Sequence, residues 1–131
     1  MQVELALEEL TTLASALVRL KFGEDEPPEP YFGSPMLAEA HRRIIESIIQ
    51  ESRQIGALGP AARWEDWQKW SSRIDEKRIV VRYASSLSEW GAWSGEQKLE
   101  VLRTCTAPFV ASDEELRDLR NQIDAARRPC R

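Results

Sequence analysis

Apolar residues recur at helical spacing along most of the chain, and this periodicity constrains the fold more than any other feature. An amphipathic helix places apolar residues three or four positions apart, whereas a half-buried strand alternates at every second position. Five stretches of the sequence follow the helical spacing. They comprise Val3, Leu7, Leu10, Ala14, Leu17 and Lys21; Leu37, His41, Ile44, Ile48 and Ile55; Ile79, Tyr83, Leu87 and Trp90; Leu99, Leu102 and Cys105; and Leu116, Leu119, Ile123 and Ala126. The pattern predicts a helix in each stretch.

Helix start signals precede three of these stripes. Ser34-Pro35 offers a hydroxyl cap followed by a proline in the first turn, where proline is tolerated. Ser94 and Gln97 have the spacing of a capping box, and so do Ser112 and Glu115. These signals agree with the periodicity and therefore strengthen the helical prediction.

The segment 61–91 permits more than one interpretation. Trp67, Trp70 and Ile74 share one helical face, but from Ile79 onward the apolar stripe changes phase. Two helices, or one long helix whose buried face rotates, would explain this change. The Ile-Val-Val triplet in the segment also permits a short strand, although no alternation surrounds it.

Together these features predict an all-α fold, a compact bundle of five or six helices with mainly antiparallel neighbours. The length of 131 residues suits one helical domain over residues 1–131. Residues 24–34 contain three prolines and four carboxylates, which predicts an acidic, proline-rich loop. We expect residues 128–131 to form a frayed tail.

Charge is distributed unevenly along the chain. The net charge is −4, and the first 34 residues carry seven acidic and two basic side chains. An acidic chain disfavours non-specific binding to nucleic acid, because phosphates must be neutralised.

The start lacks the features of a signal peptide, and no uncharged run approaches the ~20 residues that span a bilayer. Cys105 and Cys130 form neither a disulfide framework nor a zinc pattern. We therefore expect a cytoplasmic protein without membrane contact.

His41 is the only histidine, and it lies on the apolar stripe of its predicted helix. A catalytic histidine needs a nucleophile, such as Cys105 or a serine, and an orienting carboxylate. We expect instead a partly buried ring that hydrogen-bonds to the backbone or to a carboxylate. The sequence contains no Glu-x-x-His pair, calcium loop or phosphate-binding glycine loop, so we predict no metal site, no cofactor and no catalytic residue.

The five tryptophans lie between Trp64 and Trp93, and they are the most informative side chains for function. Each buried indole needs a hydrogen-bond partner, so at least one is expected to be partly exposed, with Trp64 and Trp93 favoured. Exposed aromatics anchor protein partners, and carboxylates steer basic ones. The predicted partner-binding residues are Glu24, Asp25, Glu26, Glu29, Tyr31, Phe32, Trp64 and Trp93.

Basic residues interleaved with the tryptophans support an alternative. Lys69, Arg73 and Lys77 follow i, i+4, i+8 spacing, and Arg78 and Arg82 extend this ridge. Such a surface could contact nucleic acid. Acidic residues mixed into the same segment point instead to an ordinary salt-bridged face.

Three functional hypotheses follow. The first is a non-catalytic protein-binding module that occludes a basic site on its partner, as small acidic immunity proteins, antitoxins or anti-defence inhibitors of bacterial type do. The second is a helical subunit or regulator of a nucleoprotein complex that uses the Lys69–Arg82 ridge. The third is an enzyme with a site around His41. Homo-oligomerisation remains open in all three.

Overall fold

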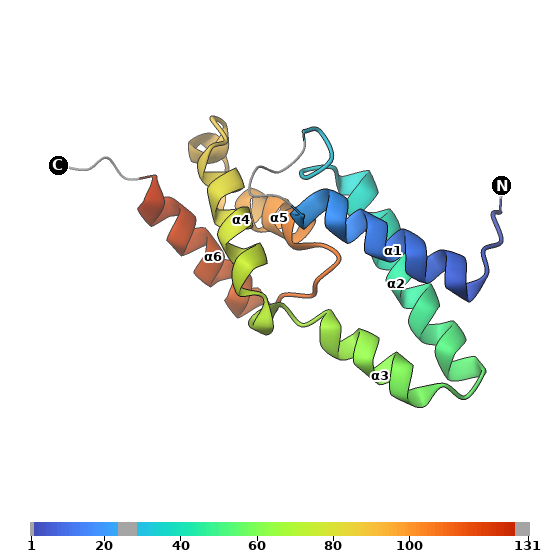
Figure 1. Ribbon diagram of the computed structural model, residues 1–131. Helices are drawn as coiled ribbons and strands as arrows, with labels where there is room; N and C mark the ends of the chain where they lie inside the picture. The colour runs from blue at the N-terminus through green and yellow to red at the C-terminus, as the bar shows by residue number, and fades with distance from the viewer. Residues whose placement is uncertain (1, 24–28, 128–131) are drawn as a thin grey trace.

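A computed structural model describes residues 2–23 and 29–127 of the protein (Figure 1). The elements are α1 (Leu7–Phe22), α2 (Pro35–Gln54), α3 (Leu58–Trp67), the 3₁₀ turn η1 (Trp70–Ser72), α4 (Ile74–Ser85), the 3₁₀ turn η2 (Trp90–Ala92), α5 (Gly95–Thr106) and α6 (Asp113–Ala126). These described ranges contain no strand, and the prediction of an all-α helical bundle is confirmed. The predicted tail at 128–131 and most of the predicted acidic loop lie outside the described residues.

The capping signals of the sequence are present in the structure. The Ser34 hydroxyl accepts a hydrogen bond from the Leu37 amide at the start of α2. Both predicted capping boxes form, at the starts of α5 and α6. Shortly after α2, Gly56 adopts a φ of 79°, a left-handed conformation that favours glycine and turns the chain toward α3.

The segment 61–91 forms two α-helices, α3 and α4, rather than one. The break arises from backbone pairing with a distant segment, since the Val110 amide donates to the Gln68 carbonyl at 2.7 Å and the Trp70 amide donates to the Val110 carbonyl at 3.2 Å. The predicted shared face of Trp67, Trp70 and Ile74 is therefore wrong. Trp70 is fully buried, whereas Ile74 is 78% exposed.

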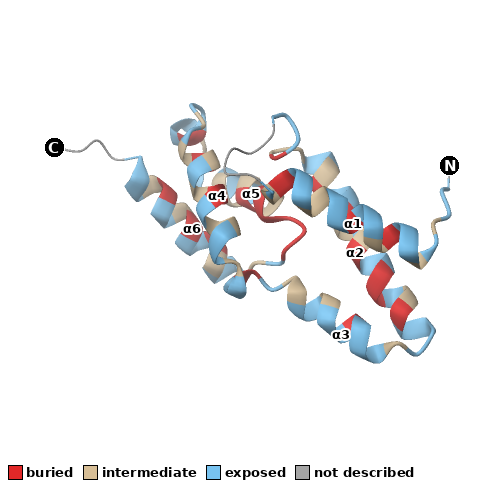
Figure 2. Ribbon diagram, viewed as in Figure 1, coloured by how far each residue is buried: buried red, intermediate tan, exposed pale blue. Residues whose placement is uncertain are grey.

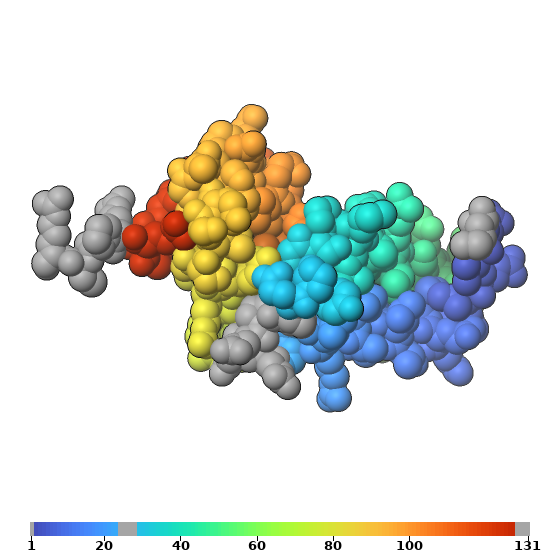
Figure 3. All heavy atoms as spheres, turned by 90° about the horizontal axis from the view of Figure 1, so that it is seen from above, coloured from blue at the N-terminus to red at the C-terminus, as the bar shows by residue number. Residues whose placement is uncertain are grey.

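Two hydrophobic clusters hold the fold together, and they define two regions. In the N-terminal layer (α1, α2 and α3), α2 packs against both α1 and α3. In the C-terminal bundle (α4, α5 and α6), each helix packs against the other two. The two regions lie side by side along the molecule (Figures 1 and 3). The smaller cluster contains Leu10, Ala14, Ile45, Ile48, Ile49 and Ala61. The larger one contains Phe32, Trp70, Ile79, Val80, Ala84, Trp90, Leu102, Cys105, Phe109, Leu116, Leu119 and Ile123.

Buried residues follow the inward faces of the helices and continue through the connection between α5 and α6 (Figure 2). Two cationic side chains of the N-terminal layer bind carbonyls near the carboxyl end of α5. Lys21 Nζ donates to the carbonyls of Thr104 at 2.7 Å and Ala107 at 2.8 Å, and Arg42 Nη2 donates to the Arg103 carbonyl at 2.6 Å. These bonds join the two regions. They are favourable because positive charge stabilises the carboxyl end of a helix.

Candidate binding groove between α1 and α3

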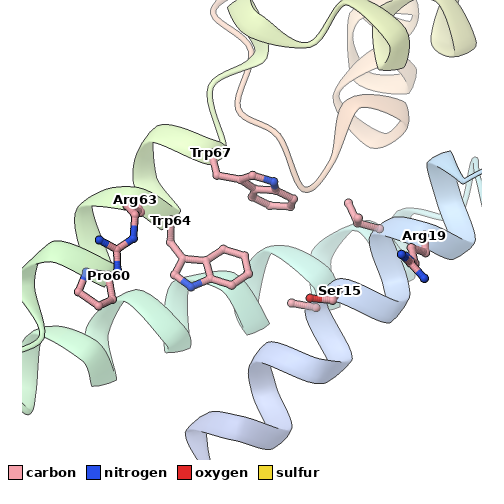
Figure 4. Close-up of a pocket in the computed structure, with 8 residues that line it drawn as sticks. Ser15, Arg19, Pro60, Arg63, Trp64 and Trp67 are labelled. Carbon is pink, nitrogen blue, oxygen red and sulfur yellow. The ribbon is translucent and has the colours of Figure 1, made fainter.

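A groove of about 390 Å³ lies between α1 and α3, which both pack on α2 (Figure 4). Its lining residues are Ala14, Ser15, Val18 and Arg19 of α1, and Pro60, Arg63, Trp64 and Trp67 of α3. In Figure 4 the two indoles project from α3 toward α1. A largely apolar recess with a few polar groups at its edge is the usual form of a binding site.

Helical spacing explains why these residues line one groove. On α3, Pro60, Trp64 and Trp67 follow i, i+4, i+7 spacing and therefore share a face. On α1, Ala14 and Val18 are four residues apart and form the opposite wall. Ala61 is buried in the smaller cluster, so α3 packs on α2 through a neighbouring face while the tryptophan face borders the groove.

Trp67 is held by contacts on both sides. Its ring centroid lies 4.8 Å from that of Phe109 and 5.2 Å from that of Trp64, the latter pair edge-to-face with an interplanar angle of 75°. The Arg73 guanidinium lies 5.0 Å from the Trp67 centroid and also donates to the Trp67 carbonyl. These contacts preorganise one wall of the groove, and Trp64 and Trp67 both remain partly exposed.

The charge at the groove is positive. Arg19 and Arg63 are exposed on opposite walls, and neither makes an ion pair with a residue of the described ranges. The nearest carboxylates on α3 are already paired, Glu65 with Arg53 and Asp66 with Lys69. The groove is therefore locally basic within a chain of net charge −4.

The predicted acidic and aromatic surface is only partly described. Glu24, Asp25 and Glu26 lie outside the described residues, whereas Glu29 and Tyr31 are exposed. Phe32 is fully buried, with its ring centroid 4.5 Å from that of Tyr83. Its predicted place on an exposed surface is therefore corrected: Phe32 fills the larger cluster.

Trp64 and Trp93 are both partly exposed, but the structure does not bring them together. Trp64 packs against the smaller cluster and lines the groove. Trp93 packs against the larger cluster, with its centroid 6.1 Å from that of Trp90, and borders a shallow depression along α5. They therefore line two different depressions and do not form the single surface that the sequence predicts.

The predicted basic ridge is divided. Lys69 lies between α3 and η1 and pairs with Asp66, and Arg73 stacks on Trp67, so these two residues do not continue a helical row. Lys77, Arg78 and Arg82 do gather, in a shallow groove of about 510 Å³ between α4 and α6. Only the carboxyl-terminal part of the ridge therefore forms a common surface.

His41 is buried, with 2% of its surface exposed, and its Nε2–H donates to the Ala14 carbonyl at 3.2 Å. Burial lowers the pKa of the ring to about 4, so the ring is neutral at pH 7. The hydrogen bond joins α2 to α1, which is the backbone contact that its position on the apolar stripe led us to expect. Within the described ranges, no three His, Cys, Asp or Glu side chains gather as a metal site.

Cys105 carries a free buried thiol whose pKa is raised to about 12 by burial. Lys21 is also buried, and loss of solvent lowers the pKa of its ammonium group to about 8. Its Nζ lies 5.3 Å from the Phe32 ring centroid. Both groups therefore belong to the packed junction between the two regions and not to an open site.

Three residues of the groove, Trp67, Arg19 and Arg63, are absent from the surface that the sequence predicts. The i, i+4, i+7 spacing of Pro60, Trp64 and Trp67 was a usable signal, but the phase of Trp70 and Ile74 suggested another face. Arg19 gives no sequence signal, because its approach to α3 depends on tertiary packing.

Comparisons with protein-family models, with curated proteins and with solved structures returned no match. None of the described helices is long and apolar enough to cross a membrane.

Proposed function

We propose that the protein is a non-catalytic protein-binding module whose partner is anchored in the groove between α1 and α3. The observation that carries this proposal is the pair Trp64 and Trp67, which is preorganised by packing and left partly exposed beside two arginines. Tryptophan and arginine are the residues most enriched at binding hot spots. We also propose that the protein is cytoplasmic and meets its protein partner there.

An inhibitory mechanism suits a module of this size. Binding through the groove would place the rest of the helical domain over the neighbouring surface of the partner and exclude its other ligands. Immunity proteins, antitoxins and anti-defence inhibitors act in this general way. The exposed Glu29 and Tyr31 support an additional acidic contact that steers the module to a basic site on the partner.

Two observations favour this function over a site around His41. The imidazole is buried, and its Nε2–H is used in a bond to the Ala14 carbonyl. Its low pKa also makes it a weak base. A second candidate, contact with nucleic acid, draws support from the clustering of Lys77, Arg78 and Arg82 between α4 and α6.

Quantitative affinity capture from a lysate of the source cells tests the proposal. We expect the wild type to capture at least one protein. The captured amount of that protein should fall about tenfold or more with Trp64→Ala, which is the loss typical of a hot spot. Met36→Ala is the matched control, because Met36 is 85% exposed and lies away from the groove. Trp93→Ala and Arg82→Glu test the competing surfaces.

The outcomes separate the candidates. If no captured protein depends on Trp64, the groove is not the partner site. Capture that is lost after nuclease treatment and with Arg82→Glu would favour the nucleoprotein alternative instead.

A further inference from the structure

We propose that the groove between α1 and α3 receives one amphipathic helix of the partner, whose apolar face contacts Trp64 and Trp67 and whose flanking carboxylates pair with Arg19 and Arg63. This inference rests on the proposed function, because it names the chemistry of the partner at the same site.

The shape of the groove fits a short helical segment. Its lining covers residues 14–19 of α1 and 60–67 of α3. At 1.5 Å of rise per residue these walls are roughly 8–10 Å long, the length of about two helical turns. Both walls belong to helices that pack on α2, so an added helix would complete a four-helix arrangement with α1, α2 and α3. Recognition of this kind uses apolar anchors at i, i+3, i+4 and i+7.

The contact surfaces inside the groove are apolar and rigid. The partly exposed Val18 presents its aliphatic side chain on one wall, where Ala14 is buried, and Trp64 and Trp67 present indoles on the other. The packing of Trp67 on Phe109 fixes the indole wall before any partner binds. A preformed wall of this type reduces the entropy lost on binding, and it suits a large aliphatic or aromatic anchor.

Charge complementarity determines what flanks these anchors. Arg19 and Arg63 stand on opposite walls, so a helix between them meets one guanidinium on each side of its apolar face. The carboxylates of Glu65 and Asp66 are engaged with Arg53 and Lys69. An acidic helix therefore finds two available cations, whereas a basic helix would meet like charge at both edges.

Selection from a displayed library of 16-residue peptides tests the occupant. The wild-type protein is the bait, and Trp64→Ala is the counter-selection bait. We expect enriched sequences that combine apolar residues at i, i+3, i+4 and i+7 with Asp or Glu beside them, and that become helical when bound. Enrichment of basic or extended sequences, or no enrichment at all, would overturn the proposal.

Charge reversal then tests the two arginines with the best selected peptide. The double variant Arg19→Glu/Arg63→Glu should weaken binding by about tenfold or more, and a peptide with Lys in place of its acidic residues should regain affinity for that variant. Arg43→Glu is the matched control, since Arg43 is exposed on α2, lies outside the groove lining and pairs with the exposed Glu39. Unchanged binding by the double variant would refute the pairing. Arg19→Gln/Arg63→Gln serves if circular dichroism shows that the double Glu variant is unfolded.

Sedimentation separates this occupant from a second copy of the chain. We expect a monomer for both wild type and Trp64→Ala. A wild-type dimer that Trp64→Ala dissociates would assign the groove to self-association and overturn the inference. A partner that depends on Trp64 in lysate capture, combined with a failed peptide selection, would leave the protein-binding function standing and refute only the helix.

Discussion

The two regions of the molecule use their aromatic residues differently. The C-terminal bundle encloses Phe32, Trp70, Trp90 and Phe109 in its core. The buried members of the N-terminal cluster are all aliphatic, and the partly buried indoles of Trp64 and Trp67 pack against it. An aromatic ring enclosed by helices contributes to stability, whereas one that is fixed but partly exposed remains available to a partner. The comparison indicates a mainly structural role for the enclosed aromatics of the C-terminal bundle, and it agrees with our proposal that the N-terminal layer binds the partner.

The buried indoles also differ in their polar atoms. Trp90 Nε1 donates to Asp124 Oδ1 at 2.7 Å, and Asp124 in turn accepts from Lys98 at 3.1 Å. Trp70 Nε1 is buried and has no hydrogen-bond partner among residues 2–23 and 29–127.

Truncation of an aromatic in each region gives the largest test of this comparison. Phe109→Ala should lower the free energy of unfolding by roughly 3–5 kcal/mol, because the ring is fully buried and its loss leaves a cavity. Trp64→Ala should cost about 1–2 kcal/mol, because the indole is already partly exposed. Urea denaturation with linear extrapolation measures both values. Equal losses of unfolding free energy would contradict the distinction between an aromatic ring that stabilises the fold and one that remains available to a partner.

Acid should weaken the N-terminal layer through His41. The pKa of the ring is about 4 in the fold because burial disfavours the charged form, against an ordinary value of 6.5. Between these pH values the unfolded chain binds a proton that the folded chain does not, so stability falls as the pH falls from about 7 to about 4. The full contribution is about 3 kcal/mol, and below pH 4 this group adds no further loss.

Urea unfolding of wild type and His41→Gln at several pH values isolates this effect. The difference between the two proteins should shrink or reverse toward pH 4, since the variant has no titrating group at this position. Hydrogen exchange should show α1 and α2 losing protection before α6, because the ring bonds to Ala14. Loss of protection that begins in α6 would contradict the assignment of the acid effect to His41. Partner binding by the folded variant should change less than its stability.

The sequence predicted the helical elements well because their signals are local. Apolar spacing and the two Ser capping boxes depend on residues within one or two turns, and both boxes are present. The break between α3 and α4 was not predictable in this way. It depends on backbone hydrogen bonds to Val110, about forty residues further along the chain.

The candidate site was only partly predictable for the same reason. Sequence reasoning favoured Trp64 as a partly exposed indole, and the structure places it on the groove. The fixed position of Trp67 depends on Phe109 and Arg73, and the burial of Phe32 depends on Tyr83. Such contacts join residues on different elements, so no periodic pattern within one segment could reveal them.

Substitution of Lys21 is expected to change stability least, and it is the sharpest test of how the two regions are joined. Lys21→Met removes the hydrogen bonds to the carbonyls of Thr104 and Ala107, but it also removes a buried charge, so the two effects partly cancel. We expect a net loss of about 1 kcal/mol at pH 7. Lys69→Met is the control, because Lys69 is exposed and its ion pair with Asp66 lies at the surface.

The pH dependence identifies the buried ammonium group directly. Its pKa is lowered to about 8 in the fold, below the ordinary value of 10.5, so the unfolded chain retains a proton that the folded chain releases between these values. The stability of the wild type relative to Lys21→Met should therefore rise from pH 8 to about pH 9.5. Urea unfolding at three pH values within this range measures that slope. A flat difference would mean that the Lys21 ammonium group is solvated. The junction would then depend on the Arg42 hydrogen bond and on apolar contacts, with Phe22 packed between Phe32 and Phe109 at centroid distances of 5.5 and 5.7 Å.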